Sequence, residues 1–478
     1  MIHINIEKIE EYFIKAQYKE CLNLIDSEDF ISVSELSLDG QLSFYFYYLF
    51  CLNILFLDER WNKELIELKK NKNNHILFNL LIFIIEMFRH VWYSEFEILG
   101  KISSEVENKF DNNLLLKYSD DPVFIKWYGI KNNFIAISYS RTDTARSIHY
   151  FEKSIELLLK CHDRYSIYYV INIIVNKGEY HHSCGELDLA LKFYKQSLDL
   201  SEEFYKKYNI RNIMREREIL SSIGNLFYLR KEFNEALEYL EKVHELLETN
   251  VYKNNFNVIS SHFDLFRVYL ALKNQAKIDE HYNEIIKIGD DPFVDLKARF
   301  LVSKALYLIN KGTMKDQGNA QEILKDMAFN DFFYNSDLIV EVLCYLAESY
   351  ILEMKTFQNE ETLSQLEKVI MKMKSLGEKL TNQQLIVQVL LIETKIDYIK
   401  GGFNEVETKL SKAYKIANEN GLLLLLDKVI EEQKNISSEI SKWKFVLSSK
   451  EDSIKKLETN ELLTYIGEVR KMKFFNIR

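Results

Sequence analysis

A large apolar residue recurs in this chain every 42 to 46 residues, followed two to three positions later by a small or aliphatic residue. The recurring positions are Phe151, Tyr194, Leu240, Tyr282, Leu324, Leu366 and Leu410. A period this regular over most of a chain predicts an array of repeats, because each repeat buries its apolar face only against its neighbours. The pattern therefore favours a repeat array over a compact enzyme domain.

The repeated unit is expected to be helical. Only two prolines, Pro122 and Pro292, and 14 glycines interrupt the 478 residues, and the apolar positions follow a helical spacing almost throughout. We therefore expect an all-α protein, an α-solenoid of about ten helix pairs joined by short connections.

Charge and cysteine content indicate which class of partner the protein binds and in which cellular compartment it resides. The formal net charge is -10, with acidic and basic residues mixed along the expected helix faces. Phosphate contacts need a basic stripe, so direct nucleic-acid binding is disfavoured and a neutral or basic protein or peptide partner is favoured. The five cysteines are odd in number and scattered, which fits reduced thiols in a cytoplasmic protein. The first residues do not have the pattern of a signal peptide.

Two apolar segments, Leu42–Leu57 and Ile76–Phe88, resemble membrane spans. Both are shorter than the roughly 20 apolar residues that a spanning helix needs. We expect them to be buried helices of a divergent, aromatic-rich helical subdomain at residues 1–120, and a membrane hairpin is the alternative.

The clearest repeat occupies Leu220–Leu247. Its two helices each have an apolar face, formed by Leu220, Ile223, Gly224 and Phe227 and then by Phe233, Ala236, Leu240 and Val243. Gly224 and Ala236 are small because the two helices cross closely there, while Phe227 and Leu240 fill the space on either side. This arrangement resembles the tetratricopeptide repeat.

The resemblance implies a right-handed superhelix of helix pairs. Because the period exceeds the 34 residues usual in that family, each helix is expected to be about one turn longer. Such long-period arrays are similar to those of bacterial and archaeal regulatory proteins, including peptide-sensing regulators. We expect the repeats at residues 121–420, a capping helix at 421–441 and a basic C-terminal segment at 442–478.

A superhelix of this family has a concave surface lined by the first helix of each repeat. The amide, aromatic and mixed-charge side chains expected there suit peptide backbones and helices. They are Asn132, Tyr139, Glu179, His182, Glu218, Asn225, Tyr228, Phe263, Arg267, Glu348, Lys395 and Tyr398. The family's carboxylate clamp is not expected, because Val175 and Ser221 stand at two of its positions. The first hypothesis is that this protein is a scaffold or sensor that binds a protein or peptide on this surface.

The nearest approach to a metal site is His181 with Cys184, which follow Cys161 and His162 by about twenty residues. His181 occupies the aromatic core position of its repeat, so packing is favoured over metal binding. The sequence contains no phosphate-cradling glycine loop, metalloprotease helix or hydrolase nucleophile elbow. We therefore expect that the protein is not an enzyme and that it binds no cofactor or metal. Two alternatives stay open: a non-catalytic regulatory subunit of a nucleic-acid-linked effector or transcriptional system, and an enzyme with an unrecognised site in the N-terminal subdomain.

The C-terminal segment differs in charge from the rest. Residues 442–478 contain nine basic and five acidic residues, a charge of +4, which leaves -14 for the preceding 441 residues. Basic and aromatic side chains gather at its end: Arg470, Lys471, Lys473, Phe474 and Phe475. Such an end can bind an acidic surface, a membrane or RNA. The default is a solvated, frayed terminus. The hypotheses are self-association through the tail and docking of the tail on the acidic array of its own chain.

Overall fold

The structure is a computed structural model that describes residues 6–27, 33–72, 75–93, 95–140, 142–248, 255–289, 294–330, 336–357, 360–379, 382–400, 403–420 and 422–448. These residues form 22 α-helices and one 3₁₀ helix, and no β-strand occurs among them. The expected all-α class is therefore confirmed. The chain divides into two compact units. The first consists of Met1–Tyr180 and Leu189–Ser222, and the second consists of His181–Asp188 and Ile223–Arg478. The four-part division made from the sequence stays a prediction.

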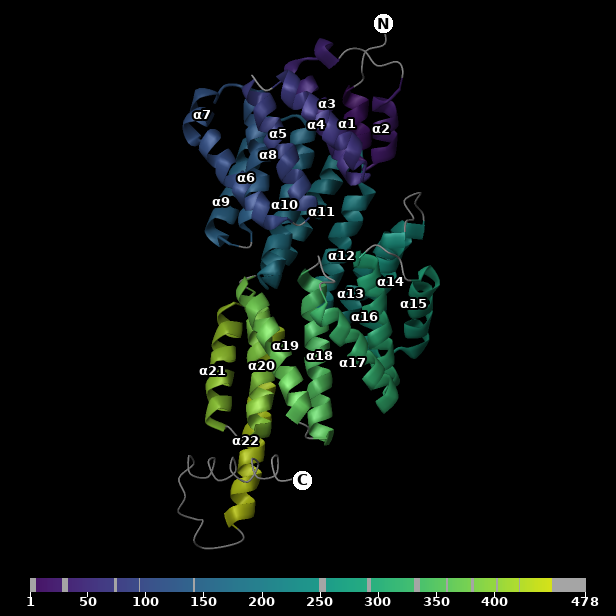
Figure 1. Cartoon of the computed structure of the whole chain (residues 1–478), viewed down its shortest axis with the longest axis vertical. Coiled ribbons are helices and arrows are strands. Elements are labelled where there is room, and N and C mark those ends of the chain that lie inside the picture. Colours follow the sequence, from purple (N-terminus) through teal and green to yellow (C-terminus); the bar gives the residue numbers. More distant parts are fainter. Residues whose placement is uncertain are drawn as a thin grey trace. The chain divides into compact units, whose positions relative to one another are not determined.

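The first unit consists of consecutive helices with short connections (Figure 1). They are α1 (Ile6–Ile14), α2 (Tyr18–Ile25), η1 (Val33–Glu35), α3 (Leu38–Ile54), α4 (Asp58–Lys72), α5 (Ile76–Trp92), α6 (Phe96–Lys109), α7 (Asn112–Lys117), α8 (Pro122–Tyr139), α9 (Thr144–Leu159), most of α10 (Arg164–Ser183), most of α11 (Leu187–Tyr208) and the start of α12 (Ile213–Leu229). Residue type fixes where α8 begins. Pro122 lies in the first turn, and the Asp121 carboxylate accepts a hydrogen bond from the Val123 amide at 2.9 Å.

An aromatic core joins the first helices to the later ones within this unit. The ring of Phe13 on α1 lies 4.6 Å from that of Tyr47 on α3, centroid to centroid, and Tyr47 lies 5.3 Å from Tyr165 on α10. The rings of Phe46 on α3 and Trp127 on α8 are also in contact, with their centroids 5.5 Å apart. The two segments that resemble membrane spans form α3 and α5, whose apolar side chains are mostly buried in this core. Among the described residues, no helix is both long and apolar enough to span a bilayer.

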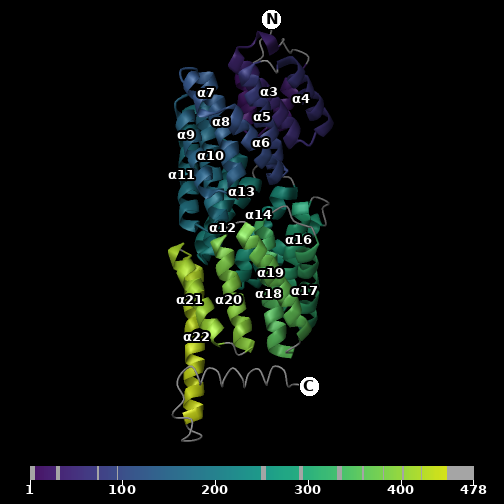
Figure 2. The ribbon, with the colours of Figure 1, turned by 60° about the vertical axis from the view of Figure 1, so that its left-hand side comes forward.

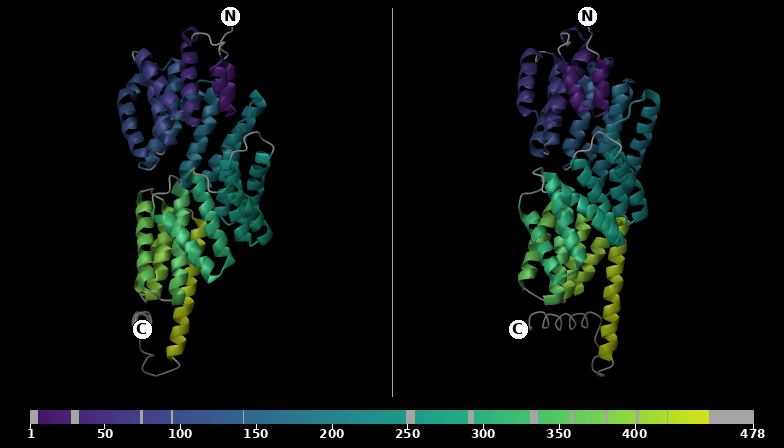
Figure 3. Two further views of the ribbon diagram at one scale, coloured as in Figure 1. Left: turned by 45° about the vertical axis from the view of Figure 1, so that its right-hand side comes forward. Right: turned by 90° about the vertical axis from the view of Figure 1, so that its right-hand side faces the viewer.

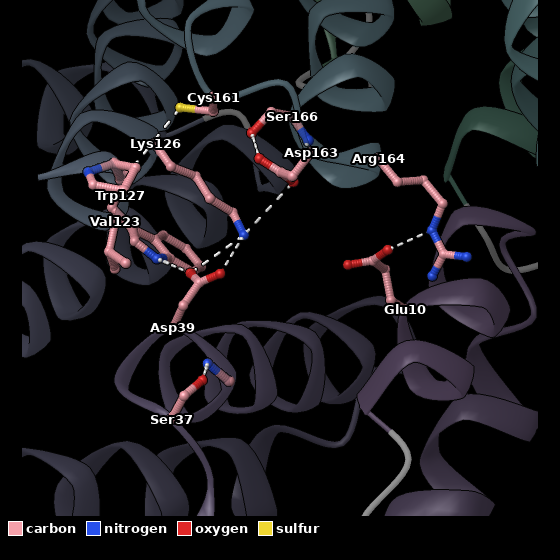
Figure 4. Close-up of polar contacts among 12 residues, drawn as sticks. Glu10, Ser37, Asp39, Val123, Lys126, Trp127, Cys161, Asp163, Arg164 and Ser166 are labelled. Atoms are coloured by element: carbon pink, nitrogen blue, oxygen red, sulfur yellow. Dashed lines mark hydrogen bonds and ion pairs between the residues drawn. The ribbon is translucent and has the colours of Figure 1, made fainter.

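Ion pairs also connect these helices at the edge of the aromatic core (Figure 4). The Lys126 side chain is 6% exposed, and its ammonium group lies 3.0 Å from an Asp39 oxygen and 3.9 Å from Asp163. Arg164 donates a hydrogen bond to Glu10 at 2.7 Å. These contacts connect α8 with α3 and with Asp163, the residue before α10, and they connect α1 with α10. The acidic partners of Lys126 supply the charge that a buried ammonium group needs.

The second unit continues the alternation of first and second helices (Figures 2 and 3). Its helices after the end of α12 are α13 (Phe233–Glu248), α14 (Asn255–Leu272), α15 (Gln275–Ile288), α16 (Val294–Lys311), α17 (Met314–Phe329), α18 (Ser336–Phe357), α19 (Glu360–Lys379), α20 (Gln383–Lys400), α21 (Phe403–Glu419) and α22 (Leu423–Ser448). Successive helices pack on one another. The first helix of a pair also contacts the first helix of the next pair: α14 contacts α16, and α18 contacts α20. This is the packing of a helix-pair array.

Close approach of the paired helices occurs where the sequence predicts it. A Cβ atom on Gly224 of α12 would lie only 2.6 Å from the Leu240 Cγ atom of α13, and Ala236 beside it is fully buried. In the first unit, a Cβ on Gly178 of α10 would lie 2.8 Å from the Tyr194 ring of α11. The predicted role of Gly224 and Ala236 at a helix crossing is therefore confirmed.

The last helices form a core of their own. Leu410 and Ala413 of α21 pack with Leu425 and Val429 of α22 in one buried cluster. Helix α22 begins at Leu423, inside the span 421–441 that is predicted as the capping helix, and continues to Ser448. Residues 449–478 lie outside the described residues, and with them the five predicted tail residues, Arg470, Lys471, Lys473, Phe474 and Phe475.

Candidate functional site

A cluster of polar and aromatic side chains in the second unit is centred on Arg267 of α14. The Arg267 side chain is 8% exposed, and its Nη2 atom donates hydrogen bonds to Asp264 at 2.9 Å and to Asn225 at 2.6 Å. Its Nη1 atom donates to Glu341 of α18. One guanidinium group thus connects α12, α14 and α18, which are all first helices of their pairs. These are the helices from which the sequence predicts a binding surface.

Aromatic rings surround the same guanidinium group. Its carbon lies 4.7 Å from the centroid of Phe263 and 5.1 Å from that of Tyr228. Arg299 of α16 lies 5.4 Å from the Phe263 centroid. Such cation–π contacts hold a charge in a partly desolvated place. We call these side chains, with Tyr345 of α18, the Arg267 cluster: Asn225, Tyr228, Phe263, Asp264, Arg267, Arg299, Glu341 and Tyr345.

The electrostatics of the cluster favour full ionisation of Arg267. Burial alone would lower the pKa of Arg267, but the carboxylates of Glu341 and Asp264 outweigh it and raise that pKa. Burial, followed by Tyr228 and Glu341, raises the pKa of the Tyr345 hydroxyl well above its ordinary value. The tyrosine therefore stays neutral at physiological pH, as a hydrogen-bonding group with a large apolar ring.

Two buried atoms of the cluster make no hydrogen bond. They are Nε of Arg267, a donor, and Oε2 of Glu341, an acceptor. A buried polar atom left without a partner costs about 1–3 kcal/mol. Both atoms belong to the pair that joins α14 to α18, so the cluster has one donor and one acceptor to spare at the same bridge.

The charge of the site is slightly negative. Arg267 pairs with the carboxylates of Asp264 and Glu341, and Arg299 lies over the Phe263 ring. Glu348 lies close enough to raise the pKa of Tyr228. Two positive groups thus stand against three negative ones. A neutral or basic ligand suits this balance better than an acidic one.

Four of the predicted surface residues meet in this cluster: Asn225, Tyr228, Phe263 and Arg267. Phe263 is only 1% exposed, so its ring packs against the two guanidinium groups and offers little surface to a ligand. Asp264, Glu341 and Arg299 also belong to the cluster but were not predicted from the sequence. Glu341 stands seven residues before Glu348, two helical turns along the same face of α18, and this spacing was the available signal.

The predicted residues of the first unit occupy separate places. Asn132 of α8 is fully buried, and neither atom of its amide has a hydrogen-bond partner. Tyr139 of α8 donates a hydrogen bond to Glu107, and Glu218 of α12 forms an ion pair with Arg215 at 2.9 Å. Glu179 is exposed and His182, which belongs to the second unit, is partly exposed.

The neighbour of Asn132 takes part in a polar run between first helices. Asn133 accepts a hydrogen bond from Asn176 of α10 at 3.1 Å, and Arg215 of α12 donates to Asn172 of α10 at 2.8 Å. This run of amide groups lies one residue away from the position that the sequence analysis chose on α8.

The last two predicted residues lie near the C-terminal helices. Lys395 of α20 is 3.6 Å from Glu432 of α22, and Tyr398 packs against the core of α20, α21 and α22. His181, the first member of the candidate metal pair, is buried and bonds to Glu186. Within the described part of the chain, no group of three or more His, Cys, Asp and Glu side chains is placed to hold a metal ion.

Comparisons with known proteins concern the architecture. No protein-family model and no curated protein matches the sequence. Among solved structures, the apo form of the quorum sensor NprR from B. thuringiensis is 14% identical, with a TM-score of 0.48, over 76% of this chain and 97% of that one. A Rap protein complexed with competence and sporulation factor is 14% identical, with a TM-score of 0.49, over 78% and 98%. Aspartyl phosphate phosphatase F from Bacillus subtilis is 17% identical, with a TM-score of 0.45, over 77% and 94%.

The chain is an array of tetratricopeptide-like helix pairs. Glycines mark the close crossings of its paired helices, and successive first helices contact one another. The expected absence of catalytic activity in this chain stays a prediction.

Proposed function

We propose that this protein binds a peptide, or an extended segment of a partner protein, at the Arg267 cluster. The observation that carries the proposal is the pair of unbonded atoms at the bridge between α14 and α18, Arg267 Nε and Glu341 Oε2. A peptide unit offers a carbonyl oxygen and an amide hydrogen, which complement a donor and an acceptor of this kind.

The rest of the cluster supports such a ligand. Asn225 supplies an amide that suits main-chain groups, and Tyr228 and Tyr345 supply apolar area with a polar end. The excess of carboxylates favours a neutral or basic ligand. A Rap protein of similar fold is described in complex with a factor, and the proposal for this chain rests on its own side chains.

In this proposal the protein is a cytoplasmic scaffold or sensor and not an enzyme. Both unbonded atoms are buried, so a ligand reaches them only when the Arg267–Glu341 pair reorients. Because this pair connects α14 with α18, binding thereby acts on the spacing of the two helices.

A displayed library of random peptides tests this function. The full chain is the target, and the affinity of a selected peptide is then measured by calorimetry for the parent, Arg267→Gln and Glu341→Gln. We expect each substitution to weaken binding by more than about tenfold, or 1.4 kcal/mol, because each removes a charged hydrogen-bonding partner.

Lys242→Gln is the matched control, since Lys242 is a charged residue of the same unit that lies on a second helix, α13, and pairs with Glu238 at 2.8 Å. It should leave the affinity unchanged. Unchanged affinity in both cluster variants, or failure to select any peptide, would argue against peptide binding at this place.

A further inference from the structure

Three histidines meet on consecutive helices of the second unit. His244 is on α13, His262 on α14 and His281 on α15. The ring centroids of His244 and His262 are 4.9 Å apart, and those of His262 and His281 are 5.2 Å apart. His262 is 8% exposed and His281 is 4% exposed. The two buried rings and the partly exposed His244 thus meet among helices that belong to two successive pairs.

A direct hydrogen bond joins two of the rings. The Nδ1 atoms of His262 and His281 are 2.9 Å apart. A neutral imidazole has one nitrogen that donates and one that accepts, so this bond requires a single proton between the two Nδ1 atoms. When both rings are protonated, two N–H groups and two positive charges face each other at this distance. The bond is therefore compatible with the neutral pair and incompatible with the doubly protonated pair.

The surroundings give little support to positive charge on these rings. Burial, followed by the charge of His262, lowers the pKa of His281 to about 4, and Glu280 opposes this only in part. Glu280 is engaged by Lys277 at 2.8 Å. On α15, Glu284 also lies near His262 and is paired with Lys287.

The other helices around the cluster present mostly neutral groups to it. From α14, the Tyr269 ring stacks on His281 at 5.4 Å, and its hydroxyl is bonded to Glu241 of α13 at 3.1 Å. Ser261 of α14 lies 3.2 Å from the Nδ1 atom of His244. Helix α16 packs on α15 through Tyr307, which donates a hydrogen bond to Asp279.

The same helix carries the histidine pair and the Arg267 cluster. His262 of α14 immediately precedes Phe263 and Asp264, which belong to the cluster. A change in how α14 packs against α13 and α15 must therefore displace the side chains that hold Arg267.

We propose that the His262–His281 pair is a proton-sensitive latch, closed at neutral pH and opened by acid, that fixes α14 between α13 and α15. Opening the latch loosens these three helices before the rest of the unit. Its effect on ligand affinity rests on the proposed peptide site, whereas the loosening itself does not.

Amide hydrogen exchange of the full chain tests the latch. Between about pH 7.5 and about pH 5, after correction for intrinsic exchange rates, protection of α13–α15 should fall by about tenfold or more. Protection of α18–α20 should change much less. His281→Gln keeps a donor and an acceptor but does not titrate, so it should remove the pH dependence in α13–α15.

The matched control is His149→Gln, which replaces an exposed histidine on α9 of the first unit and should behave like the parent. Equal pH dependence in α13–α15 and α18–α20, or pH dependence that persists in His281→Gln, would overturn the proposal. If His281→Gln does not fold, the proposal is tested on the isotope-labelled parent, by following the imidazole NMR signals of the histidines as a function of pH. Titration of all three rings of the cluster near pH 6.5 or above would overturn the latch, and a ring that titrates below about pH 5.5 supports it.

The ligand-dependent part has its own readout. Affinity of a selected peptide for the parent should weaken over the same pH range, and less so for His281→Gln. Loss of protection without a change in affinity would leave the latch in place and contradict its link to the peptide site.

Discussion

Replacement of Gly224 by alanine tests the packing of the repeat at its tightest point. The added Cβ would lie 2.6 Å from the Leu240 Cγ atom and 3.4 Å from the Ala236 carbonyl oxygen. Cγ is the branch point of Leu240, and this side chain is 1% exposed, so the contact cannot be relieved by turning a free end. Overpacking of this kind costs about 1–3 kcal/mol, while alanine in place of glycine inside a helix gains about 0.5–1 kcal/mol. We therefore expect a net loss of about 1 kcal/mol in the free energy of unfolding.

Urea unfolding followed by far-ultraviolet circular dichroism measures this loss. Gly318→Ala is the matched control, because Gly318 is a helical glycine of α17 in the same unit and a Cβ there would meet nothing within 4 Å. The control should gain stability by about 0.5–1 kcal/mol. A Gly224→Ala midpoint equal to or above that of Gly318→Ala would refute the packing argument and the repeat register built on it.

Three further perturbations follow from the buried polar groups. Arg267→Ala should lower the free energy of unfolding by about 3–5 kcal/mol, because it leaves buried carboxylates uncompensated, whereas Lys101→Ala, at a pair that is 74% and 87% exposed, should stay within about 0.5 kcal/mol in the same urea assay. Lys126→Met keeps the apolar stem but removes the partner of Asp39, and we expect a loss of about 1–3 kcal/mol by thermal unfolding. The folded-state pKa of His281, about 4, lies below the ordinary value of 6.5, so the unfolded chain binds more protons between these values. Stability should be complete above about pH 6.5 and should fall by about 3 kcal/mol as the pH drops toward 4, and a urea midpoint that is independent of pH over this range would contradict it.

Much of the fold can be predicted from the sequence because the governing contacts are local. The two long apolar runs form buried helices. Gly224 marks a helix crossing, since a small residue among large apolar ones at helical spacing lets a second helix approach closely at that point. Such patterns need only the spacing within one helix or between two neighbouring helices.

The candidate site could be predicted only in part, because its partners are distant in the chain. Arg267 and Glu341 are 74 residues apart, and no local pattern pairs them. Asn132 shows a different failure. Counting along α8 by one residue too few turns a side chain by about 100°, which places Asn132 in the packing while Asn133 bonds to Asn176.

The histidine cluster escaped sequence analysis for a related reason. His244, His262 and His281 come from three different helices, and at each position an apolar residue would fit the helical pattern equally well. Only the packing of α13, α14 and α15 brings the rings together.

The central claim, that a peptide lies against α12, α14 and α18 at the Arg267 cluster, is tested most directly by photo-crosslinking. A photoreactive phenylalanine analogue replaces Tyr345 in one protein and Tyr414, an exposed residue on the second helix α21, in another. After irradiation with a selected peptide, we expect a covalent adduct at position 345 and none at position 414. Crosslinking at position 414 with none at 345 would contradict it and move the binding surface away from the first helices.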